Sequence, residues 1–306
     1  MISNFLFHRV NPERDRLWDP MDIPLFERCI KYIVNHYTVV LIEDLALSKE
    51  LYSNKKYATI MFDDGYKDNI QYALPILEKY NCKASFYVVT DCIDKNIPTW
   101  THILEHTFQH TKINHASIDF DFLPEYLTGQ DLSTKENRIQ YVIKLKPFLK
   151  KLPHELREMV LNKISSIYTD IQIPALMMDW NDLKLLVAGG HYVGSHTVKH
   201  GMLGTMTNES DLIYELQHSA NRIKEELGYF PITISYPIGS YNAQVKQLSE
   251  KIGYKIGLAV KQQIFNPSKE DLFEISRIEL YNDPWWKTRL RITNTLEKIK
   301  SIIRYK

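Results

Sequence analysis

The chain has 306 residues, and its 38 basic and 37 acidic side chains leave a formal net charge of +1. This balance argues against a dedicated nucleic-acid-binding surface, and the length allows one large domain or two small ones. The three cysteines have no paired spacing, which is typical of free thiols in a reducing compartment. Neither a secretory signal nor an apolar run of 18 residues is present, so we expect a soluble, cytoplasmic protein.

Short apolar runs of β type alternate with amphipathic runs of helical type along most of the chain. This alternation predicts an α/β protein with a parallel sheet, either open or closed into a barrel. In such barrels the functional residues lie at the C-terminal ends of the strands. The expected strands are residues 3–10, the start of 38–47, 57–64, 83–89, 191–197, 232–239, 255–260 and 275–280, and the expected helices are 21–37, 69–81, 179–190, 210–230 and 242–254.

Two local features refine these helices. Pro75 should disturb the helix over 69–81, and Ser210 or Asp211 should cap the helix that follows. Residues 96–178 differ from the rest, because the strand pattern fades and a strongly charged helical stretch replaces it. We interpret 96–178 as a mainly helical insertion within a single domain that spans residues 1–306.

Two adjacent carboxylates, Asp63 and Asp64, stand between an apolar β run and a glycine in the stretch TIMFDDGYKDN. Neighbouring anions repel each other, and a metal ion would compensate for that repulsion. A turn with a helix cap is the alternative interpretation of this motif alone.

Two histidines, His196 and His200, are four residues apart in GSHTVKHGML. This spacing can place two imidazoles on one side of a helix or tight loop. Two imidazoles with one carboxylate, which Asp64 can supply, are a recurrent site for zinc or a similar divalent ion. Asp63 would then be free to act as a base. By itself, the histidine pair is also compatible with coincidence.

The segments IMFDDGY, DWNDLKLLVAGGHYVGSHTVKHGML and ISYPIGSYN occur in this order. Together they resemble the motifs of the NodB-like polysaccharide deacetylases, carbohydrate esterase family four. The resemblance covers residues 57–95 and 178–260. It implies a distorted (β/α) barrel with a mononuclear metal site, most simply zinc, and an activity that removes acetyl groups from N-acetylated sugars.

The resemblance also implies roles for individual residues. Asp64, His196 and His200 match the metal ligands, and Asp63 matches the general base. Ile238 falls where the family uses a backbone N–H as an oxyanion donor. Two nearby aromatic residues, Tyr66 and Tyr241, are assigned with it to the oxyanion and substrate side of the site.

The chain departs from the common family pattern at the general acid, because no histidine follows His218. Instead, Leu6-Phe7-His8 forms an L-x-H motif at the end of the first expected strand. This arrangement resembles a circularly permuted subgroup of the family and makes His8 the expected general acid. A buried or capping histidine is the alternative.

A second departure is that Ser235 stands where the family carries an arginine that orients the base. Arg277, at the start of the last expected strand, could take over this task through charge-assisted hydrogen bonds to Asp63. A plain surface salt bridge is the alternative. One of the adjacent Trp285 and Trp286 could stack on a sugar ring, or both could serve packing. We interpret Asp179 and Trp180 as a helix start and a core contact.

The C-terminal tail, residues 287–306, carries seven basic residues and one acidic residue among leucines and isoleucines. Such a segment can lie on an anionic membrane, although a solvated terminal helix fits the same pattern. We therefore expect a cytoplasmic, metal-dependent sugar de-N-acetylase of surface glycan biosynthesis, with an N-acetylated glycan, a lipid-linked sugar or a nucleotide sugar as substrate. The alternatives are a non-catalytic glycan-binding protein and a deacylase of a non-sugar amide or O-acetyl ester.

Overall fold

The structure is a computed structural model that describes residues 1–47 and 55–297. Within these residues, eight strands form one sheet with the order β7-β6-β5-β4-β3-β1-β8, and β2 also pairs with β3. All of the strand pairs are parallel. The strands are β1 (Ile2–Phe7), β2 (Thr38–Val39), β3 (Tyr57–Phe62), β4 (Ser85–Val88), β5 (Tyr192–Ser195), β6 (Thr233–Ser235), β7 (Ile256–Leu258) and β8 (Ile278–Glu279).

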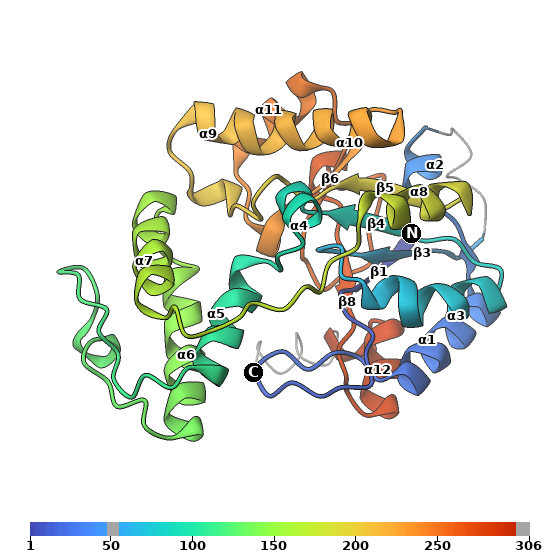
Figure 1. Ribbon diagram of the computed structural model, residues 1–306. Helices are drawn as coiled ribbons and strands as arrows, with labels where there is room; N and C mark the ends of the chain where they lie inside the picture. Colours follow the sequence, from blue (N-terminus) through green and yellow to red (C-terminus); the bar gives the residue numbers. More distant parts are fainter. Residues whose placement is uncertain (48–54, 298–306) are drawn as a thin grey trace, which may run out of the picture.

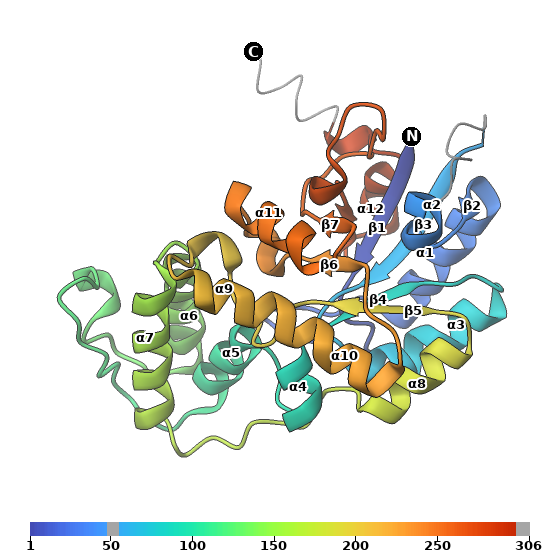
Figure 2. The same cartoon turned by 90° about the horizontal axis from the view of Figure 1, so that it is seen from above.

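The sheet curls so that its two ends approach each other. An isolated parallel bridge joins Leu258, at the end of β7, to Ile275, in the segment that leads into β8. The backbone N–H of Ala259 donates to the Ile275 carbonyl at 2.9 Å. Helices surround the sheet (Figures 1 and 2). This is the distorted (β/α) barrel that the sequence predicted.

Helices α1 (Ile23–His36), α3 (Leu74–Lys79), α8 (Trp180–Ala188), α10 (Ser219–Leu227) and α11 (Ala243–Ile252) lie around the barrel (Figure 1). Shorter helices connect them. These are α2 (Ile42–Leu47), α4 (Thr90–Lys95) and α9 (Glu209–Ile213).

The core explains the local sequence at β1 and β3. Both strands lie inside the sheet and are buried almost throughout, so most of their residues are apolar. Phe7 stacks on Phe62 with 5.5 Å between ring centroids, and Phe62 stacks on Phe86 at 4.9 Å. Because Phe7 and Phe62 are also register partners, the chain leaves both strands at the same height. His8 and Asp63 therefore emerge next to each other.

Two helix features test the sequence predictions. Pro75 does disturb its helix, since a π-helical turn over Asn69–Ala73 precedes α3. The predicted cap of α9 was wrong: the side chain of Asn208 caps this helix and accepts a hydrogen bond from the backbone N–H of Ser210 at 3.0 Å. Asn208 is the cap because the helix begins at Glu209, which places Ser210 and Asp211 inside its first turn.

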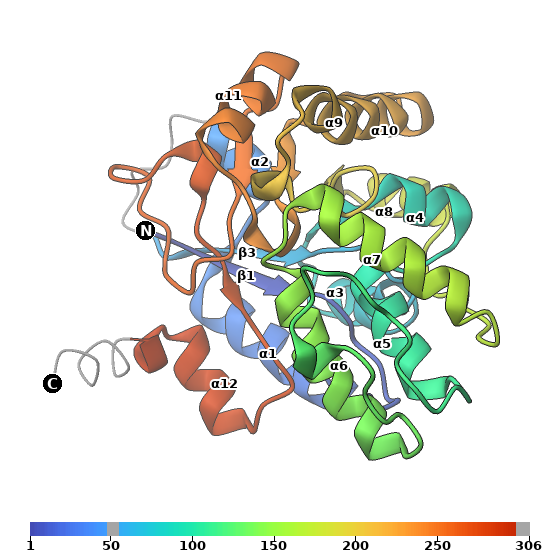
Figure 3. The ribbon, with the colours of Figure 1, turned by 90° about the vertical axis from the view of Figure 1, so that its left-hand side faces the viewer.

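Residues 96–178 supply three longer helices, α5 (Trp100–His110), α6 (Lys135–Leu149) and α7 (His154–Ile167). Figure 3 shows them grouped on one side of the barrel. They pack around a hydrophobic cluster that is separate from the barrel core and includes Phe108, Val142 and Val160. These helices lie within the segment predicted to be mainly helical, and its interpretation as an insertion stays a prediction.

The last helix, α12 (Trp285–Ile292), packs against α1. Trp285 contacts Tyr32 edge-on at 5.7 Å between centroids, and the Arg28 guanidinium lies 4.4 Å from its ring centre. Trp286 is 64% exposed on the surface. Residues 298–306 of the basic tail lie outside the described residues. Within 1–47 and 55–297, no helix is both long and apolar enough to cross a membrane.

Candidate active site

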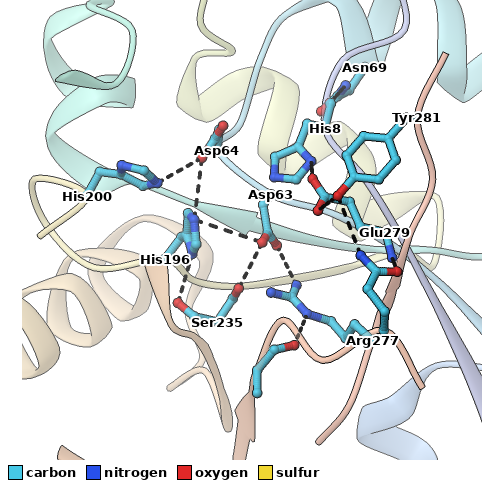
Figure 4. A network of polar contacts seen from close by, with 12 residues as sticks. His8, Asp63, Asp64, Asn69, His196, His200, Ser235, Arg277, Glu279 and Tyr281 are labelled. Carbon is cyan, nitrogen blue, oxygen red and sulfur yellow. Dashed lines mark hydrogen bonds and ion pairs between the residues drawn. The ribbon is translucent and has the colours of Figure 1, made fainter. Parts of the chain in front are cut away.

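Three side chains from distant parts of the chain converge at the C-terminal ends of β3 and β5. Asp64 Oδ1 lies 3.4 Å from His196 Nε2 and 3.4 Å from His200 Nε2 (Figure 4). All three residues are buried, and one potential ligand atom from each lies within 4.8 Å of the other two. The carboxylate and the two imidazoles predicted to meet therefore do meet.

Unusual backbone conformations aim these side chains. Asp64 has φ of 77° and is followed by Gly65 with φ of 90°, and His200 has φ of 59°. Seven described residues other than glycine have positive φ, and three of them are asparagines, which tolerate this region. The other four are Asp64, Thr197, His200 and Ile238, which all belong to this site or its motifs. Strained backbone concentrated in this way is typical of a functional site.

The donor set fits a divalent cation. Asp64 Oδ1 is buried without a hydrogen-bond partner among the described residues. His196 Nδ1 donates to the Ser235 carbonyl at 2.8 Å, and this bond orients the ring so that Nε2 faces Asp64. Burial lowers the pKa of His200 to about 3, which keeps its imidazole neutral and able to ligate. One carboxylate with two imidazoles is a donor set typical of zinc and related ions.

The neighbouring Asp63 is anchored by two partners outside this cluster. Arg277 donates to Asp63 Oδ1 at 2.9 Å, and the Ser235 hydroxyl donates to Oδ2 at 3.0 Å. Burial alone would raise the pKa of Asp63, but the charge and hydrogen bond of Arg277, together with the nearby His196 and His8, outweigh it and hold this pKa below its ordinary value. Asp63 is therefore an ionised carboxylate, 4.0 Å from His196 Nε2.

Arg277 itself is completely buried and comes from the residues just before β8. Its Nε donates to the Ala259 carbonyl at 3.1 Å, which fixes the guanidinium plane beside Asp63. The alternative interpretation, a plain surface salt bridge, is excluded because both partners of the pair are buried.

His8 lies across the site from the histidine pair (Figure 4). Its Nδ1 is 3.6 Å from Glu279 Oε1, and its backbone carbonyl accepts a hydrogen bond from Asn69 Nδ2 at 2.8 Å. Trp18 packs edge-on against the His8 ring, with 5.6 Å between centroids. His8 is neither fully buried nor a capping residue, and part of its side chain remains exposed.

These residues border one cavity of about 340 Å³. Ile238 belongs to its wall and has φ of 58°, a conformation that a β-branched residue adopts rarely. The insertion closes the other side of the cavity with side chains from α5 and from the end of α6. The complete lining is His8, Trp18, Asp63, Asp64, Thr101, Glu105, Lys146, Lys150, His196, His200, Ile238, Val260, Glu279 and Tyr281.

Tyr66 and Tyr241, which were assigned to the substrate side, do not line this cavity. Tyr66 is fully buried, and its hydroxyl lies 3.2 Å from His102 Nδ1. Tyr241 stacks on Tyr236 with 4.9 Å between centroids. Their packing explains the difference, because Tyr66 contacts His102 and Tyr241 contacts Tyr236, and neither partner lines the cavity. We assign neither tyrosine a substrate contact.

Asp179 and Trp180 fulfil the predicted structural roles. The Asp179 side chain accepts a hydrogen bond from the Asp182 backbone N–H at 2.9 Å, and the Asp182 side chain accepts one from the Asp179 backbone N–H at 2.9 Å. The two bonds form a capping box at the start of α8. Trp180 packs against the barrel core.

Sequence reasoning missed two residues with direct contacts to the site. Ser235 bonds both Asp63 and His196, but its place in the motif indicated only a missing arginine. Glu279 contacts His8 and also accepts a hydrogen bond from the Tyr281 hydroxyl. Strand periodicity offers a signal for Glu279, since it follows Arg277 by two residues and side chains two apart share one face of a strand.

Comparisons with known proteins agree with this geometry. The family model for polysaccharide deacetylases matches residues 51–257. The chain belongs to the polysaccharide deacetylase family. It is 22% identical over 217 residues to the Bacillus subtilis (strain 168) protein "Putative polysaccharide deacetylase YxkH", covering 71% of this chain. The chain spans about half the length of this curated relative, of which 49% is covered.

Solved structures share the fold of this polysaccharide deacetylase. The Streptococcus pyogenes deacetylase PplD, in complex with acetate, has a TM-score of 0.64 and 17% identity, with 95% of this chain and 97% of that chain covered. A de-N-acetylase from Aggregatibacter actinomycetemcomitans has a TM-score of 0.61 and 15% identity, with 95% and 99% covered.

The family match includes Asp63, Asp64, both histidines and Ile238, but His8 and Arg277 lie outside residues 51–257. Their assignment to the site therefore depends on the geometry of this deacetylase alone. The circular permutation of the chain stays a prediction.

Proposed function

We propose that this protein is a metal-dependent hydrolase that removes N-acetyl groups from a sugar or oligosaccharide. The observation that carries the proposal is the buried cluster of Asp64, His196 and His200, with a second, separately anchored carboxylate on Asp63 at the same cavity. Membership of the polysaccharide deacetylase family supports the same class of reaction.

The chemical difficulty is that an acetamide is a poor electrophile and neutral water is a poor nucleophile. A divalent ion held by Asp64, His196 and His200 would activate water and polarise the acetamide carbonyl. Asp63 takes the proton from the attacking water, because Arg277 and Ser235 keep its carboxylate ionised and correctly oriented.

Two further groups complete the reaction. The backbone N–H of Ile238, at the cavity wall, is assigned to the oxyanion that develops on the former carbonyl oxygen. His8, on the opposite side, donates a proton to the departing amine so that the C–N bond breaks and the amine leaves neutral. Glu279 Oε1 lies 3.6 Å from His8 Nδ1, where it can orient the imidazole.

A non-catalytic glycan-binding protein would be favoured if His8 lay far from the metal cluster. His8 instead lines the same cavity as the cluster, which supports an enzyme. A deacylase of a non-sugar amide or an O-acetyl ester would use the same residues, and a substrate panel separates it from the sugar deacetylase.

The decisive experiment measures metal content and acetate release together. Asp63→Asn removes the base, and with it the charge partner of Arg277, but none of the three metal-ligating residues. It should therefore retain the metal while acetate release from N-acetylated sugars falls by about 10²- to 10⁴-fold. His196→Ala removes a ligand and should lose both metal and activity. Metal-free protein that releases acetate at the full rate would contradict the mechanism.

We further propose that the enzyme acts in the cytoplasm on precursors of surface glycans, with peripheral contact to the anionic inner membrane surface. The basic segment 287–306 supports the membrane contact. Failure of the purified protein to bind anionic liposomes at low ionic strength would reject it.

A further inference from the structure

The insertion places two lysines in the wall of the catalytic cavity, Lys146 within α6 and Lys150 directly after it. Lys146 forms an ion pair with Glu105, a buried residue of α5. Lys150 is half-buried and makes no hydrogen bond or ion pair with any of the described residues. Of the two lysines in the cavity lining, Lys150 is therefore the one that has no carboxylate partner among the described residues.

The carboxylates of the cavity are already engaged. Asp63 pairs with Arg277, Asp64 faces the two histidines, Glu105 pairs with Lys146, and Glu279 contacts His8 and Tyr281. With a divalent ion in the histidine cluster, Asp64 is compensated, and Asp63 and Glu105 each already have one cationic partner. The Lys150 ammonium therefore remains available to a negative group that enters the cavity.

The position of Lys150 is set by the fold. Its backbone N–H donates to the Lys146 carbonyl at 3.1 Å and caps the C-terminus of α6, so its side chain starts from a fixed point. Burial, reinforced by the Lys146 charge, lowers the pKa of Lys150. An anion beside the ammonium would compensate for this loss of hydration.

We propose that Lys150 is a specificity-determining residue that binds an anionic substituent of the acetylated substrate, a phosphate or a carboxylate on the sugar or directly linked to it. The inference rests on the proposed deacetylase function and deepens it, because it names the substrate class. It also gives the insertion a role, since Lys150, directly after α6, would contact the charged group of the substrate. A phosphate would come from a glycosyl phosphate, whereas a carboxylate would come from an acidic sugar.

The test measures binding rather than turnover. It uses the metal-loaded full chain with His8→Gln, which slows turnover and leaves the Asp63–Arg277 pair intact. Binding is followed by calorimetry or by the fluorescence of Trp18 in the cavity wall. The probes are N-acetylglucosamine 1-phosphate, N-acetylglucosaminuronic acid and the neutral methyl glycoside of N-acetylglucosamine. We expect at least one anionic probe to bind about tenfold more tightly than the neutral one, and the stronger of the two identifies the source of the charge.

The matched variants are Lys150→Met and Lys151→Met, since Lys151 is the exposed neighbour with the same charge. Lys150→Met should raise the Kd for the anionic probe about tenfold and leave the neutral probe within twofold, whereas Lys151→Met should change neither. Lys150→Arg should restore most of the lost affinity, and this variant also guards against misfolding of the methionine form.

Three results would overturn the proposal. These are equal weakening of neutral and anionic probes by Lys150→Met, no effect of this variant on any probe, and no binding of any probe to the metal-loaded protein. Acetate release from the neutral glycoside by the unmodified enzyme tests the proposed function separately. An active deacetylase without charge preference would therefore reject only the role of Lys150.

Discussion

Arg277→Met is the change that most directly tests how the catalytic base is held. Arg277 is fully buried, and its guanidinium provides the closest positive charge to Asp63, at 2.9 Å. Methionine has a similar length but neither charge nor donors. The variant therefore leaves a buried carboxylate with only the Ser235 hydroxyl and the metal cluster beside it.

The magnitude follows from the burial of the pair. Removing one partner of a buried ion pair costs about 3–5 kcal/mol of unfolding free energy, because the remaining charge is left without compensation. Asp63 can avoid part of this cost by binding a proton. Without Arg277, burial is no longer opposed by that charge, so the pKa of Asp63 should move from below its ordinary value to above it.

The direction of the pH dependence can be stated for both proteins. In the unmodified protein, the lowered pKa of Asp63 contributes stability above the unfolded value of about 3.9, and this contribution is lost as the pH falls through the folded pKa. In the variant, ionised Asp63 destabilises the fold at neutral pH, and the penalty shrinks as the pH falls through the raised pKa. The stability difference should therefore be largest near neutral pH and smaller near pH 4.

Two measurements check this reasoning. Urea unfolding across pH gives the stability difference, and the pH profile of kcat/KM should show its acidic limb moved to higher pH in Arg277→Met. Arg222→Met is the matched control, because it removes an arginine–carboxylate pair with Asp94 outside the cavity. Acidic limbs that coincide in Arg277→Met and the unmodified enzyme would refute the assignment of Arg277 as the positioning residue of the base.

Three further predictions concern the acid, the metal and the turn that presents its ligand. His8→Gln should keep the bound metal and lower kcat by about 10²- to 10⁴-fold, as loss of a general acid requires, and an unchanged kcat would reassign the acid. Zinc at 100 times its Kd should raise the unfolding free energy by about 2.7 kcal/mol, which a thermal melt detects as a higher Tm. A chelator should remove this gain, and Asp64→Ala should not show it. Gly65→Ala should cost about 1–3 kcal/mol and weaken metal binding, because Gly65 has φ of 90° and a Cβ would lie 3.0 Å from Ile93 Cδ1. Gly228→Ala is its control, since Gly228 has φ of 81° with no atom within 4 Å of the added Cβ, and equal metal affinity in both variants would contradict this account.

The sequence by itself determined the parts of the protein that depend on local pattern. Buried parallel strands require continuous apolar runs, so β1 and β3 were visible, and the acids at the end of β3 were placed at the functional edge of the sheet. The pair His196 and His200 was visible because both ligands lie in one short loop. The helical nature of α6 and α7 followed in the same way from their composition.

Only the tertiary structure decided the contacts between residues far apart in the chain. Asp63 and Arg277 are 214 residues apart, and no periodic pattern links them. The same holds for the Ser235 hydroxyl on Asp63 and for the lysines that α6 brings to the cavity. Packing also removed Tyr66 from the site, since its ring is buried beside His102. These outcomes depend on how the sheet curls and where the insertion docks, and both result from many weak contacts that local sequence does not encode.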